Sequence, residues 1–391
     1  MNEPLLVERI EAIPLRCALP PAQQHVSDFG RISRFDTVLV AVHLAGGITG
    51  YGEAKPAVGS AGECAAICAA VESDLAPLVV GQDGRNVTAL WWRMYSGVRA
   101  DHALRSGRAM GALDRRGTRL AAISGIDIAL WDALGKALQL PVHQLLGGRC
   151  RTQVPAYASG GWADADAIGD ELLGYQARGG FRAFKMRVGV MDGNLDKAVA
   201  RVQAARKAVG AGAELMADTH GTLSVTEAKR FCRRVEELDL AWLEEPVAAD
   251  DHAGMAEVRR STDIPIAAGE SEMTQFAFRD LLAAAAVDVL QPDPAIAGGI
   301  SEVHRIATLA SAHLKGVAPH LWGSAILLTA GLHLAAACPN IVTLEYPMGG
   351  NPMLHELVHE PPKVRDGCLE IPERPGLGLE IDLDFVKSHR L

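Results

Sequence analysis

Short apolar segments alternate with helical stretches eight times between residues 154 and 347. The segments are VPAYAS (154–159), AFKMRV (183–188), ELMADT (214–219), AWLEEP (241–246), IPIAAGE (264–270), VDVLQPD (287–293), KGVAPH (315–320) and IVTLEYP (341–347). Strands that alternate with helices form parallel sheets, and eight such units close into a (β/α)8 barrel. An open doubly wound sheet is the rival, but it usually carries GxGxxG at its first turn. The nearest glycine run, VGAGAEL (209–215), lacks that spacing. The pattern therefore favours an α/β barrel.

The residues before the barrel follow a different pattern. Two stretches are rich in strand-forming residues, LLVERIEAIPLRCAL (5–19) and FDTVLVAVHLAGGITGYGEA (35–54), and the second predicts a hairpin that turns at Gly46-Gly47. From about residue 62 the pattern becomes helical. A chain of 391 residues is also longer than one core usually holds. We expect three parts: an α+β capping domain over 1–125, a barrel over 126–350, and a C-terminal segment over 351–391 that returns to the capping domain.

Composition excludes several classes of partner. The net charge is −9 and no basic stripe offsets it, which argues against nucleic acid. The longest apolar runs, such as LLAAAAVDVL (281–290), are too short to span a membrane. The first residues carry acids and prolines where a signal peptide needs a basic start and an apolar run. Seven cysteines, an odd number without paired spacing, indicate free thiols. We expect a cytoplasmic enzyme that binds neither nucleic acid nor membranes.

Three acids stand at the ends of consecutive predicted barrel strands, where barrels collect their chemistry. Asp218, Glu244 and Glu270 follow one another at 26-residue intervals, from 218 to 244 and from 244 to 270. That interval is about one strand–helix unit, so the three carboxylates should converge on one mouth. Converging carboxylates repel unless a hard cation lies between them, and oxygen ligands suit Mg²⁺, with Mn²⁺ as a possible substitute. Ordinary helix-capping acids are the structural alternative, which three acids at this spacing disfavour.

Other polar residues share the same mouth in this prediction. His320 ends the seventh strand, and Asp293 on the preceding strand is placed to fix its tautomer, which makes His320 a candidate base. Lys185 and Arg187 lie two apart on one strand and share a face. That face is either the barrel interior, near the carboxylates, or the surface.

The motifs around these residues form a recognisable set: AISGIDIALWDALGKALQLPVHQLLGG (122–148), FKMR, D-x-H, WLEEP, AAGES, QPDPAIAGGIS and APHLWGS. Together they resemble the mandelate racemase/muconate lactonizing enzyme branch of the enolase superfamily. The resemblance implies a capping domain over a modified (β/α)7β barrel, with Mg²⁺ on Asp218, Glu244 and Glu270 and a base that removes the proton α to a carboxylate. It also implies that Glu345 binds or protonates the substrate carboxylate. In the Glu244-Glu245 pair it makes the first residue the ligand, and strand alternation agrees.

Two departures indicate which reaction the chain performs. Racemases of this branch carry a second lysine where this chain has Arg187, which stays protonated and is a poor base, so racemisation is disfavoured. His220 in the D-x-H motif resembles the acid of members that dehydrate sugar acids by expelling the 3-hydroxyl. We therefore predict dehydration of an aldonate or aldarate to a 2-keto-3-deoxy acid through an enediolate. His320 is the base, His220 is the acid, and Lys185 either neutralises the substrate carboxylate or acts as a base itself.

Several alternatives stay open. A racemase, epimerase or cycloisomerase acting on a related acid would use the same scaffold, and a non-catalytic binding barrel is a third class. His355-Glu356-Leu357-Val358-His359 spells the zinc-protease motif HExxH, but prolines on both sides leave room for only a short helix.

Substrate recognition is expected from the capping loop LPPAQQHVSDFGRIS (19–33). Within that loop His25 and Arg31 could bind distal hydroxyls or a second carboxylate, and Trp322 and Trp162 could line the pocket. The family resemblance also implies a homo-oligomer.

Overall fold

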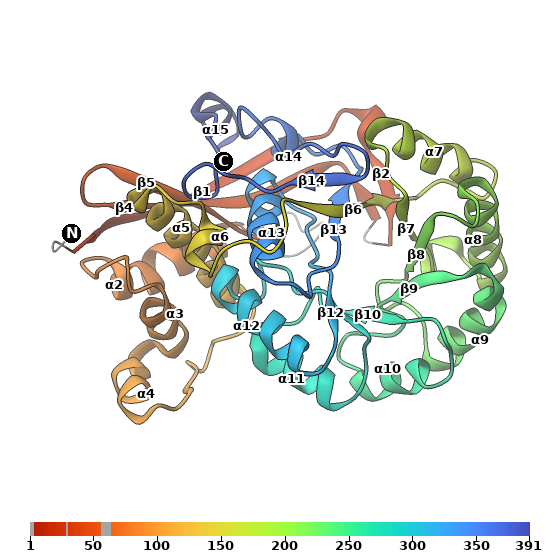
Figure 1. The fold of residues 1–391 in the computed structure, drawn as a ribbon, viewed down its shortest axis with the longest axis horizontal. Coiled ribbons are helices and arrows are strands. Elements are labelled where there is room, and N and C mark those ends of the chain that lie inside the picture. Colours follow the sequence, from red (N-terminus) through yellow and green to blue (C-terminus); the bar gives the residue numbers. More distant parts are fainter. Residues whose placement is uncertain (1–3, 29, 56–63) are drawn as a thin grey trace.

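A computed structural model describes residues 4–28, 30–55 and 64–391 of the chain (Figure 1). Of the capping loop, only Phe29 lies outside the described residues. A parallel barrel and an N-terminal antiparallel sheet with its own helices make up the fold. No helix in the described ranges is both long enough and apolar enough to cross a membrane.

All eight predicted barrel strands are present and parallel. They are β6 (Gln153–Gly160), β7 (Ala183–Arg187), β8 (Glu214–Asp218), β9 (Leu240–Glu244), β10 (Ile266–Ala268), β11 (Val289–Leu290), β12 (Gly316–Val317) and β13 (Leu344–Pro347). The strands pair in the order β12-β11-β10-β9-β8-β7-β6-β13. A parallel bridge between Val317 and Ile341 joins the two ends of that order. The barrel prediction is therefore confirmed.

Seven helices alternate with the eight strands, which gives the (β/α)7β form. They are α7 (Ile168–Gly179), α8 (Leu195–Val209), α9 (Val225–Val235), α10 (His252–Arg259), α11 (Thr274–Ala283), α12 (Gly299–Ala312) and α13 (Ala325–Ala337). Local sequence sets several starts: Ser224 and Glu227 form a capping box at α9, and the Asn194 side chain caps α8.

The HExxH motif does not form a zinc-protease helix. The helix at this motif is α14 (Pro352–His355), which ends at the first histidine of the motif. His355 and His359 therefore do not share one helical face, as a zinc protease requires.

The capping unit is a three-stranded antiparallel sheet covered by helices. It contains β1 (Val7–Ala18), β4 (Arg34–Leu44), β5 (Ile48–Ala54), α1 (Cys64–Ala69), α2 (Ala76–Val79), α3 (Val87–Ser96), α4 (Ala100–Ser106) and α5 (Thr118–Leu138). The turn between β4 and β5 has positive φ at Gly46 and Gly47, as the hairpin prediction requires. A second hairpin, β2 (His25–Ser27) and β3 (Gly30–Ile32), extends from this unit.

Helix α5 indicates where the capping unit ends. The boundary expected at residue 125 lies inside α5, and the buried apolar residues of this helix, apart from Ile128, belong to the capping core as far as Leu134. We propose that the capping unit ends after α5, before the short α6 (Val142–Leu145).

The C-terminal segment contacts both units. Its strand β14 (Cys368–Glu370) pairs with β6 of the barrel. After α15 (Leu383–His389), the amide of Leu391 donates to the carbonyl of Pro14 in β1 at 3.0 Å.

Replacing Gly52 with alanine should destabilise the protein by about 3 kcal/mol, since small-to-large changes in tight packing cost about 1–3 kcal/mol or more. Gly52 of β5 packs directly on α5, and an added Cβ would overlap the carbonyl oxygen of Gly125. Chemical denaturation measures the change. Gly174→Ala is the matched control, because Gly174 lies inside α7 with no atom within 4 Å of an added Cβ. It should stabilise by about 0.5–1 kcal/mol. Equal effects of both variants would contradict this packing argument.

Candidate active site

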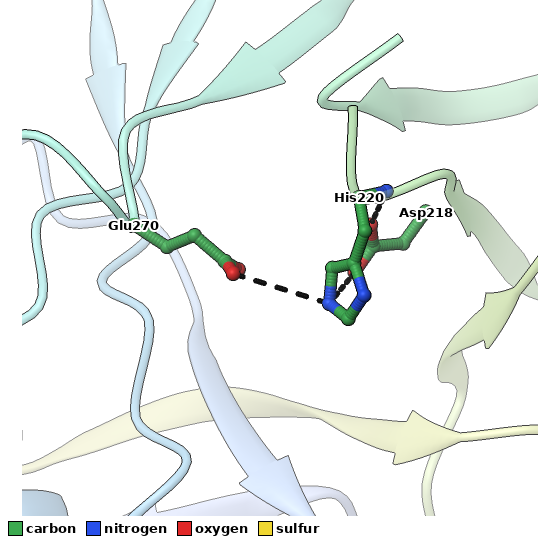
Figure 2. A group of neighbouring side chains, drawn as sticks. All are labelled: Asp218, His220 and Glu270. Atoms are coloured by element: carbon green, nitrogen blue, oxygen red, sulfur yellow. Dashed lines mark hydrogen bonds and ion pairs between the residues drawn. The ribbon is translucent and has the colours of Figure 1, made fainter. Parts of the chain in front are cut away.

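Three groups that could hold a metal converge at the carboxyl ends of β8 and β10, the two strands on either side of β9. Asp218 is the last residue of β8, His220 follows it by two residues, and Glu270 follows β10 by two residues. Figure 2 shows their side chains pointing toward one another across the barrel mouth. One potential ligand atom from each lies within 4.8 Å of the others. The predicted convergence of Asp218 and Glu270 is therefore present in the structure.

Glu244 lies in the same mouth, but its oxygens are engaged by neighbouring donors. Lys185 Nζ donates to Oε1 at 2.5 Å, while Trp242 Nε1 and Gln291 Nε2 donate to Oε2 at 3.0 and 2.6 Å. The tight group of possible ligand atoms among the described residues thus includes His220 and not Glu244.

The backbone at Glu245 departs from the strand conformation. Strand β9 ends at Glu244, and Glu245 has a positive φ of 40°, so strand alternation no longer sets its direction. Burial raises the pKa of Glu245 well above its ordinary value, and the Glu270 and Asp218 carboxylates raise it further. The Glu245 side chain is therefore electrostatically part of the acidic cluster.

Lys185 and Arg187 both face the barrel interior, so the surface alternative is wrong. Lys185 Nζ lies 2.9 Å from Glu345 Oε1, and Arg187 donates to Asp218 Oδ2 at 2.7 Å. Burial alone would lower the pKa of Lys185, but the Glu244 and Glu345 carboxylates outweigh it and raise the pKa well above its ordinary value. A protonated Lys185 favours the role of a cation over that of a base.

The mouth carries more acid than base. Its buried carboxylates are Asp218, Glu244, Glu245, Glu270 and Glu345, and its buried permanent cations are Lys185 and Arg187. Five carboxylates against two cations leave an excess of three negative charges if all are ionised. Glu270 Oε2 is also buried without a hydrogen-bond partner in the described chain. An oxygen-rich site with surplus negative charge and an unsatisfied acceptor suits a hard divalent cation.

His320 and Asp293 form the predicted pair. His320 Nδ1 lies 2.7 Å from Asp293 Oδ2, and both side chains are buried. Burial would lower the pKa of His320, but the Glu270 and Glu345 carboxylates raise it above its ordinary value overall. Lys55, from the capping unit, donates to the same Asp293 oxygen at 2.7 Å and to the Trp322 carbonyl at 2.6 Å.

His220 belongs to a second pair of the same kind. Its Nδ1 lies 2.7 Å from Oδ2 of Asp28, a residue of the turn between β2 and β3. Its Nε2 lies 3.9 Å from Glu270 Oε1, while His320 Nε2 lies 3.5 Å from Glu270 Oε2. Two imidazoles, each with an aspartate on Nδ1, therefore approach different oxygens of one carboxylate.

Aromatic side chains gather beside this site. His25 stacks on Trp162 with ring centroids 4.1 Å apart, and Trp322 lies 6.4 Å from His25. Trp322 Nε1 donates to Ser159 Oγ, which donates in turn to Glu345. The structure thus brings His25, Trp162 and Trp322 together near the carboxylates. Arg31 instead is exposed on β3, paired in register with Val26.

Comparison with known proteins decides the family. Residues 167–385 match the model of enolase C-terminal domain-like proteins. Residues 12–147 match the N-terminal domain of mandelate racemase and muconate lactonizing enzyme. This chain belongs to the mandelate racemase/muconate lactonizing enzyme family. The family resemblance predicted from the motifs is therefore confirmed.

Curated members of the family similar to this chain include enzymes that act on sugar acids and their lactones. The D-galactonate dehydratase of Verminephrobacter eiseniae is 36% identical over 354 residues, which cover 87% of each chain. The D-galactarolactone cycloisomerase of Agrobacterium fabrum is 34% identical over 373 residues, 92% of this chain and 93% of that one. Among solved structures, a racemase from Streptomyces coelicolor with bound magnesium has a TM-score of 0.86 and 30% identity, covering 99% of this chain and all of that one.

Proposed function

We propose that this protein dehydrates a sugar acid, an aldonate or an aldarate, to a 2-keto-3-deoxy acid. The observation that carries the proposal is the pair of aspartate-bound histidines, His320 and His220, on either side of Glu270. Dehydration needs one group to remove the C2 proton and another to protonate the departing 3-hydroxyl. The similarity to a D-galactonate dehydratase supports the same choice.

In the proposed reaction His320 Nε2 accepts the proton from C2, and the substrate becomes an enediolate. His220 then gives a proton to the 3-hydroxyl, the C3–O bond breaks, and water leaves. The resulting enol rearranges to the 2-keto-3-deoxy acid. Lys185 and Arg187 place fixed positive charge beside the substrate carboxylate, where charge develops during the reaction. Glu345, held by Lys185, Ser159 and the Leu321 amide, would help bind or protonate that carboxylate.

We propose Asp218, Glu244 and Glu270 as the residues that would hold Mg²⁺, with Mn²⁺ as a substitute for the same oxygen ligands. The surplus negative charge and the buried Glu270 oxygen, which accepts no hydrogen bond from the described residues, support this assignment. When bound, the cation supplies positive charge against the two negative charges that the substrate carboxylate carries once its α-proton is gone.

Removing divalent cations should abolish dehydration, and added Mg²⁺ should restore it. Mg²⁺ at about 100 times its Kd should also stabilise the fold by about 2.7 kcal/mol through binding, which a thermal shift titration measures. Glu270→Gln should weaken that shift because it removes one ligand charge, whereas Glu257→Gln, an exposed acid on α10, should not. Full activity of protein shown by elemental analysis to contain no metal would contradict the proposal.

The decisive test of function is a screen of acid sugars with Mg²⁺ for 2-keto acid formation. The alternative is a racemase, epimerase or cycloisomerase, which the D-galactarolactone cycloisomerase relative favours. Exchange of solvent deuterium at C2 without loss of water would favour an epimerase or racemase. Opening of a lactone ring, with no deuterium exchange in the other compounds of the library, would favour a cycloisomerase. A 2-keto-3-deoxy product that forms from an open-chain acid with loss of water identifies the dehydratase.

We further propose a cytoplasmic homo-oligomer with a small carboxylate substrate. All seven cysteines are free, which supports a reducing compartment. Light scattering of the purified protein tests the oligomeric state.

A further inference from the structure

Asp28 lies where the capping unit meets the barrel mouth. It occupies the turn between β2 (His25–Ser27) and β3 (Gly30–Ile32), far in sequence from the barrel residue that it contacts. Its Oδ2 lies 2.7 Å from Nδ1 of His220, and only 8% of the Asp28 side chain and 3% of the His220 side chain are exposed. This short contact therefore joins the two units through two buried side chains.

His220 is the nearest charged partner of Asp28: its hydrogen bond and charge lower the pKa of the Asp28 carboxyl, and the Arg187 charge and the Asp28 backbone lower that pKa further. The second oxygen, Oδ1, is buried and has no hydrogen-bond partner in that part of the chain. Burying a carboxylate costs several kcal/mol unless it is paired. The hydrogen bond to His220 is the largest of the interactions that stabilise the buried Asp28 carboxylate, which ties this side chain to the imidazole.

The contact fixes which ring atom of His220 faces the reaction. The backbone of His220 is held in the left-handed region, with φ of 46° and its amide donating to Asp218 Oδ1 at 2.9 Å. Rotation of the ring by half a turn about χ2 would still exchange the two sides of the imidazole. With Nδ1 bound to Asp28, Nε2 is the nitrogen directed into the mouth, 3.9 Å from Asp218 Oδ2 and from Glu270 Oε1.

We propose that Asp28 is a positioning residue that holds His220 with Nε2–H directed at the substrate's departing hydroxyl. This inference rests on the proposed dehydration. In the step it serves, the Nε2 proton passes to the 3-hydroxyl oxygen, and the C3–O bond breaks. The electron pair of the enediolate forms the C2–C3 double bond as water leaves. The histidine that remains regains its proton from solvent. Asp28 takes no part in bond making, because it contacts only Nδ1.

Asp28→Asn is the sharpest variant, since it keeps the size of the side chain and removes its charge. The Mg²⁺-loaded protein should lose roughly 100-fold in kcat for dehydration, in line with the loss of a group that orients another. The rate of C2 deuterium exchange should stay within about two-fold, because His320 performs that step. A 3-deoxy-3-fluoro substrate analogue should largely rescue the variant, since fluoride leaves without full proton transfer. Val26→Thr, 53% exposed on the same hairpin, is the control that should leave every rate unchanged.

Equal dehydration by Asp28→Asn and the unmodified protein would overturn the inference. So would an equal fall in exchange and dehydration without rescue by the fluoro analogue, which indicates a merely structural role. Long-range ¹H–¹⁵N spectra of the Mg²⁺-loaded protein give a readout independent of turnover, with His220→Asn identifying the signal. The inference is supported if the spectra show a proton on Nδ1 of His220 in the unmodified protein and if Asp28→Asn shifts or removes its signal. This result would hold even if the screen finds no dehydration and the proposed function fails. Absence of that proton in the unmodified protein overturns the inference.

Discussion

His320→Asn is expected to lower kcat for dehydration by about 10³–10⁴-fold and to abolish deuterium exchange at C2. General base catalysis contributes about 10²–10⁴-fold, and asparagine cannot accept the proton. Because Asp293 acts through His320, the double variant His320→Asn/Asp293→Asn should be little worse than His320→Asn alone. Product formation and exchange are both followed by ¹H NMR in deuterium oxide.

His313→Asn, on an exposed histidine just after α12, is the matched control and should leave both rates unchanged. Retention of C2 exchange by His320→Asn would show that another base acts. Lys185, which the sequence left open as a base, would then be tested next with Lys185→Met.

His220→Asn is expected to separate the two halves of the reaction. Dehydration should fall by about 10²–10⁴-fold, because the departing hydroxyl loses its proton donor, while exchange at C2 continues. Asparagine is the appropriate replacement because it tolerates the left-handed backbone that His220 adopts, with φ of 46°. The ratio of exchanged substrate to product, measured in one NMR sample, checks the prediction.

A matched control for this variant is His304→Asn, since His304 lies on α12 and no role in the reaction is proposed for it. If His220→Asn dehydrated at the normal rate, the acid would have to be a different group and His220 would serve only to bind substrate. If His220→Asn lost deuterium exchange at C2 as well as dehydration, proton removal and hydroxyl protonation could not be assigned to separate histidines.

The barrel and the residues at its strand ends could be predicted because both follow from local periodicity. Each of the eight apolar segments became a strand, and a strand's carboxyl end fixes which way Asp218, Lys185 and Arg187 face. Gln291 was missed although a signal existed. It lies two residues before Asp293, directly after β11, and donates to Glu244.

The site residues that the capping unit supplies could not be predicted from local sequence periodicity. Asp28 and Lys55 contact residues about 190 and 240 positions away, and such contacts depend on how two units dock rather than on any repeat in the sequence. The direction of the Glu245 side chain could not be predicted from strand alternation, because β9 ends at Glu244 and Glu245 has a positive φ.

Two residues at the carboxyl end of β5, Glu53 in the strand and Lys55 just after it, bind the barrel. Glu53 accepts hydrogen bonds from the amide and hydroxyl of Ser324, and Lys55 binds Asp293 and the Trp322 carbonyl. The capping unit therefore binds the residues that directly follow His320, at Trp322 and Ser324, and also the aspartate that pairs with His320. A chimera that joins the capping unit of one relative to the barrel of another must therefore keep this glutamate and lysine together. Without them the chimera would contain the histidine but not the contacts that position the residues around it.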